Sequence, residues 1–225
     1  MTSPESIVFL FDVDNTLLDN DTAQNEYRAE MARQCGEDGA LRYWTILQAL
    51  TKEIGYTDYL GALQRYRLEA MYDPQLLHMS SFLLDYPFAQ RLYPDALKVL
   101  QHVGQWGTTA LLTDGDVVFQ PRKVERSGLW QAVHGRVLIY IHKEAELDEV
   151  ERRYPAQHYV MVDDKLRLLT AIKAIWGQRV TTVFPRQGHY AADPAVLAMY
   201  PPADITIDHI GELLNYSRAE FVVLR

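Results

Sequence analysis

The sequence has little that would tie it to an oxidising or membrane environment. It contains a single cysteine, Cys35, which excludes an intrachain disulfide and a cysteine-based metal site. The opening residues, MTSPES, carry neither a basic nor an apolar segment, so no signal peptide is expected. The apolar runs are far shorter than the roughly 18 residues that a membrane-spanning helix needs. We therefore expect a soluble, cytoplasmic protein.

An excess of positive charge is also lacking. The formal net charge is −8 and the isoelectric point is near 5.3. A protein that binds nucleic acid without sequence preference needs a basic surface, so we expect no nucleic-acid partner. No membrane partner is expected either, because the apolar runs are too short to span a membrane. An anionic substrate is still compatible with this charge, because one metal ion and a few well-placed cations can reverse the potential locally.

What the sequence does contain is a series of short apolar runs separated by helical patterns. Runs that are apolar on both faces are typical of parallel strands buried between two layers of helices. Helical patterns with a terminal glycine follow at residues 93–107 and 163–177. The alternation predicts an α/β fold with a doubly wound, mostly parallel, Rossmann-like sheet. The predicted strands are residues 7–11, 109–113, 137–141, 159–163, 180–184 and 204–207.

Residues 20–90 interrupt this alternation. Four helical patterns lie in this interval, and none of its segments reads convincingly as a strand. Roughly 70 residues of helix exceed what a crossover between parallel strands requires. We therefore expect an inserted all-helical cap domain at residues 20–90 and an α/β core domain made of residues 1–19 and 91–225.

The stretch IVFLFDVDNTLLDND, residues 7–21, raises an electrostatic question. A predicted strand runs directly into two acids, Asp12 and Asp14. Two carboxylates so close together repel each other, and each loses solvation wherever it is even partly buried. A structural turn needs only one Asp or Asn, so the pair predicts that a cation gathers there.

Three further strands end on polar residues as well. In open α/β sheets ligands bind at the carboxyl ends of the strands, so these residues are expected to meet at one edge. In chain order the four strand ends carry Asp12, Asp14 and Thr16; Thr113 and Asp114; Lys143; and Asp163 with Asp164.

In this order the residues resemble the four motifs of the haloacid-dehalogenase (HAD) superfamily of hydrolases, in its phosphatase-like subgroup with a helical cap after the first motif. DVDNT, residues 12–16, matches the first motif, and the strand ending in Thr113 matches the second. Lys143 matches the third, and the paired acids Asp163 and Asp164 match the fourth. The fourth motif more often reads Gly-Asp, so the division of labour between these two acids stays open. Asp114 stands where Asn is common in the family.

The resemblance implies an Mg²⁺-dependent phosphatase. Asp12 would be the nucleophile that forms an aspartyl phosphate, and Asp14 the general acid and base. Phosphate would be bound by Thr113, Asp114 and Lys143, with Thr113 and Lys143 counted among the catalytic residues. Mg²⁺ would be held by Asp12, Asp163 and Asp164 together with the backbone carbonyl of Asp14. The expected partner is a small phosphorylated metabolite, and the chain is expected to be a monomer or a homodimer.

Other interpretations stay open at this point. A phosphotransferase or phosphomutase would use the same residues with a sugar hydroxyl in place of water. A 2-haloacid dehalogenase would keep the nucleophile but would need neither Asp14 nor a metal. A phospho-acceptor domain carries similar residues in a different order, and an inactive relative would serve as a binding module. Asp163 could simply cap the following helix, and the acids Asp19, Asp21 and Asp116 are expected to be solvated or capping residues.

Overall fold

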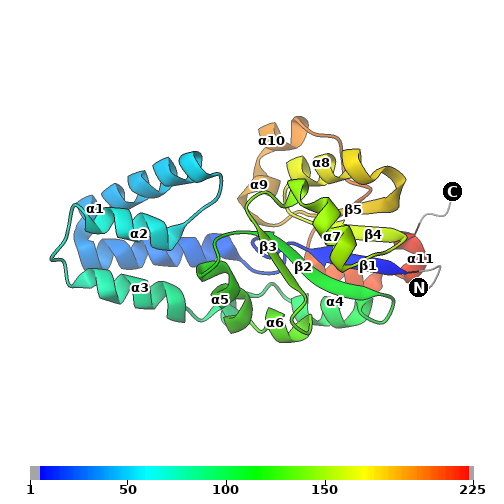
Figure 1. Cartoon of the computed structure of the whole chain (residues 1–225), viewed down its shortest axis with the longest axis horizontal. Helices are drawn as coiled ribbons and strands as arrows, with labels where there is room; N and C mark the ends of the chain where they lie inside the picture. The colour runs from blue at the N-terminus through cyan, green and yellow to red at the C-terminus, as the bar shows by residue number, and fades with distance from the viewer. Residues whose placement is uncertain (1–5, 223–225) are drawn as a thin grey trace.

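A computed structural model describes residues 6–222 as six parallel strands with helices on both faces (Figure 1). The order across the sheet is β3-β2-β1-β4-β5-β6, and every neighbouring pair is parallel. This arrangement confirms the predicted doubly wound α/β fold. The strands are β1 (Ile7–Phe11), β2 (Thr108–Asp114), β3 (Val137–Tyr140), β4 (His158–Val162), β5 (Val180–Pro185) and β6 (Ile205–Ile207).

The direction in which strands are added reverses between β1 and β4. From β1 the chain adds β2 and β3 on one side, and then β4, β5 and β6 on the other. Phe11 is in register with Val162, so the residues that follow β1 and β4 leave the sheet side by side. In open parallel sheets the crevice outside the strand ends at such a reversal is the usual ligand site.

Alternate residues of β1 face opposite layers of helices. Phe9 and Phe11 lie in a buried cluster with α4 (Ala96–Val103), α5 (Phe119–Arg126), α6 (Leu129–Ala132) and α11 (Arg218–Phe221). Val8 and Leu10 lie in a second cluster with α7 (Leu147–Arg153) and α8 (Leu166–Trp176). Burial on both faces explains why these strands read as continuous apolar runs. Two short helices, α9 (Gly188–Ala192) and α10 (Pro194–Ala198), follow β5.

The interval after β1 is helical within the described residues. It contains α1 (Asn20–Ile54), α2 (Tyr59–Arg67) and α3 (Gln75–Asp85), which project away from the sheet (Figure 1). Helix α1 is interrupted at Gly36, whose φ of 74° and ψ of 168° are not helical. The buried cluster on one sheet face continues into these helices. The division into a core of residues 1–19 and 91–225 and a cap of residues 20–90 stays a prediction.

The two connections between the sheet and these helices run side by side. The Asp19 backbone N–H donates to the Arg91 carbonyl at 2.7 Å, and the Tyr93 N–H donates to the Leu17 carbonyl at 2.9 Å. The Asp19 carboxylate also accepts from the Thr22 N–H at 2.9 Å, which caps the first turn of α1. These contacts fix the helical segment above the carboxyl ends of β1 and β4. Among residues 6–222, no helix has both the length and the apolar character that a membrane span requires.

Candidate active site

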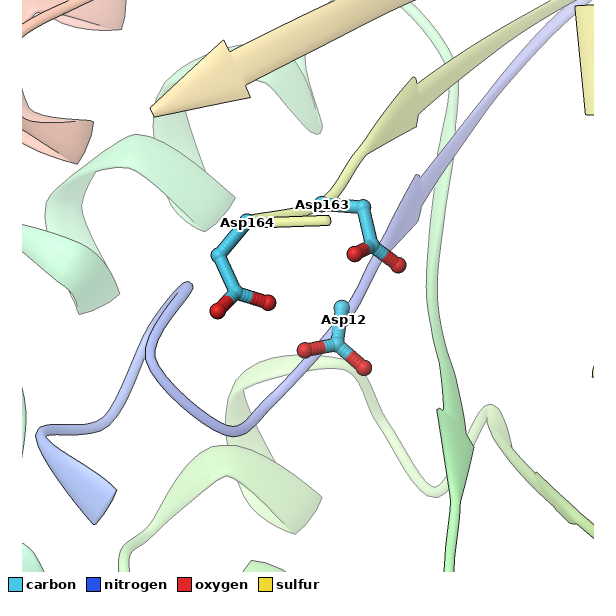
Figure 2. A group of neighbouring side chains, drawn as sticks. All are labelled: Asp12, Asp163 and Asp164. Atoms are coloured by element: carbon cyan, nitrogen blue, oxygen red, sulfur yellow. The ribbon is translucent and has the colours of Figure 1, made fainter. Parts of the chain in front are cut away.

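Three buried carboxylates meet at the reversal point of the sheet. Asp12 follows β1, and Asp163 and Asp164 follow β4 (Figure 2). One oxygen from each of the three lies within 4.8 Å of the others. The hydroxyl of Thr16 joins the two strand ends, because it accepts from the Asp164 N–H at 3.1 Å and donates to Asp12 Oδ2 at 3.4 Å. Thr16 therefore holds the ends of β1 and β4 together.

The three carboxylates suit a divalent cation. Among the described residues, neither oxygen of Asp164 has a hydrogen-bond partner, and the side chain is fully buried. Burial raises the pKa of the Asp164 carboxyl well above its usual range and also raises that of Asp163. A dication among these oxygens would restore the ionised forms, and oxygen ligands are those that Mg²⁺ prefers. Asp12, Asp163 and Asp164 could therefore hold a metal ion.

The two acids of the fourth motif differ in their contacts. Asp163 Oδ1 accepts from the Lys165 N–H at 2.8 Å, and its Oδ2 lies 2.6 Å from Lys143 Nζ. Asp164 has neither kind of partner among residues 6–222. Its oxygens are thus the more available of the two for a metal ion.

Lys143 lies beneath the carboxylates at the start of a short 3₁₀ turn, Lys143–Ala145. Its Nζ contacts Asp12 Oδ1 at 2.5 Å, Asp163 Oδ2 at 2.6 Å and the Leu112 carbonyl at 3.2 Å. Burial by itself would lower the pKa of this ammonium, but the charges of Asp12 and Asp163 raise it above its ordinary value. Lys143 is therefore a cation that holds the first and fourth motifs together.

The carboxylate of Asp14 points away from this group and toward α5. Both of its oxygens accept from Lys123 Nζ, at 2.7 and 2.8 Å, and the same ammonium reaches Asn20 Oδ1 at 3.0 Å. Lys123 is only 1% exposed, whereas the Asp14 side chain is 25% exposed and lines a cleft. Among the described residues, the carboxylate of Asp14 does not belong to the metal-binding group. The family resemblance assigned only the backbone carbonyl of Asp14 to the metal.

Thr113 and Asp114 lie at the end of β2. The Thr113 hydroxyl accepts from Gln120 Nε2 at 3.1 Å, and Asp114 Oδ1 accepts from the Lys143 N–H at 2.8 Å. Burial raises the pKa of Asp114 to about 6, against the opposing effect of the Lys143 charge. Asp114 lines the cleft, and the predicted binding of phosphate by Thr113, Asp114 and Lys143 stays a prediction.

Sequence reasoning missed Lys123, Gln120 and Lys165. Gln120 and Lys123 lie three residues apart on α5 and so share one face of the first helix after β2. That spacing could have indicated a polar site on one face of the helix, because polar residues on the buried face of a helix need partners. Lys165 follows directly after the paired acids. Burial by itself would lower the pKa of its ammonium, but the charges of Asp12 and Asp164 outweigh this effect and raise it.

A cleft of about 560 Å³ lies over this edge of the sheet, between α1 and α2 on one side and the core loops and α9 on the other. Its walls touch at two points. Gly55, at the end of α1 with φ 89°, lies so close to His142 that an added Cβ would be 2.8 Å from the ring. Asp21, in the first turn of α1, accepts from the His189 N–H at 2.8 Å. Asp116 accepts from the N–H groups of Val118 and Phe119, as expected for a capping acid.

A parallel Rossmann-like sheet with an acidic centre at its reversal point defines an α/β protein of the kind that binds ligands at the strand ends. Comparison of structures adds a 62% identical relative, a protein of Burkholderia xenovorans LB400 named as a haloacid dehalogenase-like hydrolase. The alignment covers 95% of this chain and 100% of that one, with a TM-score of 0.90. The chain belongs to the haloacid dehalogenase superfamily of hydrolases, which confirms the predicted family.

More distant structures share the fold. The HAD-hydrolase YfnB of Bacillus subtilis, solved bound to magnesium, is 16% identical with a TM-score of 0.60, covering 94% of this chain and 98% of its own. The L-2-haloacid dehalogenase of Xanthobacter autotrophicus is 18% identical with a TM-score of 0.56, covering 92% and 96%. No protein-family model matches the chain, and no match is found among curated proteins.

Proposed function

We propose that this hydrolase removes phosphate from a small-molecule phosphomonoester in an Mg²⁺-dependent reaction that passes through an aspartyl phosphate on Asp12. The observation that carries the proposal is the position of Asp14. Its carboxylate lines the cleft two residues after Asp12, where it can exchange protons with a leaving group and with water. A carbon–halogen hydrolase has no use for this acid, since a halide leaves without a proton.

In the first step an oxygen of Asp12 forms a bond to phosphorus while the bond from phosphorus to the ester oxygen breaks. Asp14 gives a proton to that oxygen, which leaves as an alcohol. In the second step water attacks the phosphorus of the aspartyl phosphate and Asp14 takes the proton from the water. The bond from phosphorus to Asp12 then breaks, which releases phosphate and regenerates both carboxyl groups.

The surrounding residues hold these two acids in place. Lys143 contacts Asp12, and Lys123 binds both oxygens of Asp14, so each carboxylate has a fixed orientation. A magnesium ion bound by Asp12, Asp163 and Asp164 would supply positive charge for the phosphoryl oxygens. The YfnB structure, which has the same fold, was solved with magnesium, and this supports the choice of metal.

The test is a release assay on the purified protein with a panel of phosphorylated metabolites and with 2-haloacids, in the presence and in the absence of Mg²⁺. We expect phosphate release that requires Mg²⁺ and that is fastest for one chemical group of phosphorylated metabolites. Halide release that persists in a chelator would replace the proposal with a dehalogenase. Transfer of the phosphoryl group to an added acceptor alcohol, with no release of free phosphate in the absence of that acceptor, would indicate a phosphotransferase.

Magnesium is expected to stabilise the folded protein more at pH 7.5 than at pH 5. Burial raises the pKa values of Asp163 and Asp164, so both carboxyls keep protons above the ordinary aspartate range, and the metal must displace them. Stability contributed by these protonated groups is present at low pH and is lost as the pH rises through the raised pKa values. At a hundredfold excess over Kd, binding adds about 2.7 kcal/mol, a rise in Tm of roughly 5–10 °C for a chain of this size.

The measurement is thermal unfolding with and without Mg²⁺ at both pH values. Asp164→Asn removes the carboxylate that has no hydrogen-bond partner among the described residues, and it is expected to abolish the Mg²⁺-induced rise in Tm. The control, Asp116→Asn, is expected to keep this rise. An equal shift at pH 5 and pH 7.5, or a full shift in Asp164→Asn, would contradict the assignment of the metal site.

A further inference from the structure

Of the three lysines around the carboxylates, two already contact carboxylate oxygens in the part of the chain that the structure describes. A lysine ammonium has three N–H groups and no acceptor. Lys143 Nζ donates to Asp12 Oδ1 and to the Leu112 carbonyl, and it forms an ion pair with Asp163 Oδ2, which has no hydrogen-bond partner among the described residues. The charge of Lys143 is therefore shared with two buried carboxylates before any phosphoryl group binds.

The ammonium of Lys123 also contacts a carboxylate already. Its three contacts are with the two oxygens of Asp14 and with Asn20 Oδ1. It is also enclosed by aromatic rings, with Nζ 5.9 Å from the centre of Phe88 and 5.3 Å from that of Phe119. Lys123 therefore orients Asp14 and is not placed to receive an anion from the cleft.

Lys165 is different. It lines the cleft directly after Asp164. In the part of the chain that the structure describes, its Nζ has no hydrogen-bond partner and no carboxylate at ion-pair distance; it lies 5.3 Å from the ring centre of Tyr190. The ring attracts the positive charge through its face and leaves the N–H groups free to point into the cleft.

We propose that Lys165 adds a cationic contact for the phosphoryl group of the substrate at the wall of the cleft. This inference deepens the proposed function and rests on it. It adds, to the phosphate contact that the family resemblance assigns to Lys143, a second lysine that lines the cleft. The expected ligand is a phosphate monoester, whose oxygens accept charge-assisted hydrogen bonds from an ammonium.

Charge in the cleft supports this role. The carboxylates of Asp12, Asp114, Asp163 and Asp164 all act electrostatically on Lys165 or are acted on by it. Even with a dication bound, a phosphate dianion that enters this region meets carboxylate charge. An ammonium that is free to donate at the wall of the cleft offsets that repulsion for the anion, whereas one already paired with carboxylates offsets it much less.

The experiment measures binding of inorganic phosphate to Asp12→Asn protein in the presence of Mg²⁺, by isothermal titration, so that no turnover is needed. Lys165→Met in this background keeps most of the aliphatic stem and is expected to weaken phosphate binding by roughly 10- to 100-fold. Lys165→Arg, which restores a cation, is expected to recover most of the affinity. The matched control is Arg167→Met, because Arg167 also lines the cleft but is bound to Glu144 at 2.8 Å.

The outcomes separate this inference from the proposed function. Unchanged phosphate affinity in Lys165→Met, or an equal loss in Arg167→Met, would overturn the assignment of Lys165, even if the wild-type enzyme hydrolyses phosphomonoesters. A protein that releases no phosphate from any ester but loses phosphate binding specifically in Lys165→Met would overturn the proposed reaction and keep the assignment. A change in the Mg²⁺ affinity alone would show that Lys165 only offsets the charge of the metal ligands, and would also overturn it.

Discussion

Asp12→Asn is expected to reduce Mg²⁺-dependent phosphate release by roughly 10⁴-fold or more, because removing a nucleophile removes the covalent route altogether. An amide oxygen is a far weaker nucleophile than a carboxylate oxygen and forms no stable acyl phosphate. The fold is expected to survive, since Asn has nearly the same shape and Lys143 keeps its contacts with Asp163 and the Leu112 carbonyl. The measurement is release of p-nitrophenol from p-nitrophenyl phosphate at saturating Mg²⁺, together with thermal unfolding.

Asp19→Asn is the matched control for this variant. Asp19 lies in the same acidic stretch but caps α1 through the Thr22 N–H, and Asn caps a helix as well as Asp does. Its activity and Tm are expected to stay close to those of the wild type. If Asp12→Asn kept substantial activity while folded, Asp12 would not be the nucleophile.

Asp14→Asn is expected to lower kcat/KM by roughly 10²–10⁴-fold for phenyl phosphate, the range typical of a lost general acid or base. The loss for p-nitrophenyl phosphate is expected to be clearly smaller, because that leaving group departs without needing a proton. The amide keeps the side chain's size and its oxygen can still accept from Lys123, but its NH₂ group replaces the second oxygen that Lys123 contacts, so thermal unfolding is measured alongside to check the fold. The comparison of the two esters isolates proton transfer from substrate binding.

The control for Asp14→Asn is Asp116→Asn, which changes an acid of the neighbouring loop that caps α5. Both esters are expected to react at wild-type rates in this variant. An equal loss for the two esters in Asp14→Asn would show that Asp14 orients the substrate and does not transfer a proton. An unchanged rate for phenyl phosphate would remove Asp14 from the mechanism.

Much of the fold could be predicted from the sequence because it depends on local patterns. Strands buried on both faces have continuous apolar sequences, and the six apolar runs in this sequence correspond to the six parallel strands of the sheet. The four helical patterns expected in residues 20–90 correspond to three helices, the first of them interrupted at Gly36, whose positive φ is one that glycine adopts without strain. In the same way, the motif residues Asp12, Thr113, Asp163 and Asp164 could be placed at strand ends.

The partners of these residues could not be predicted, because they depend on long-range packing. Lys123 is 109 residues from Asp14 in the chain, and nothing local to either residue indicates that they meet. The same applies to Lys143, which is 131 residues from Asp12. A lysine in a helical segment is usually solvated, and only the packing of α5 against the strand ends and the start of α1 explains the burial of Lys123.

The sequence by itself determined the class of fold, the family and the four strand ends, because each follows from short runs of residues. Only the tertiary structure decided which lysines contact carboxylates among the described residues and which lysine lines the cleft. That difference arises because the reversal of strand order between β1 and β4 brings Asp12 and Asp163 together over Lys143, and leaves Lys165 facing the cleft. The partners of a lysine ammonium depend on residues that are distant in the chain, so only packing in three dimensions decides whether it meets a carboxylate or a cleft.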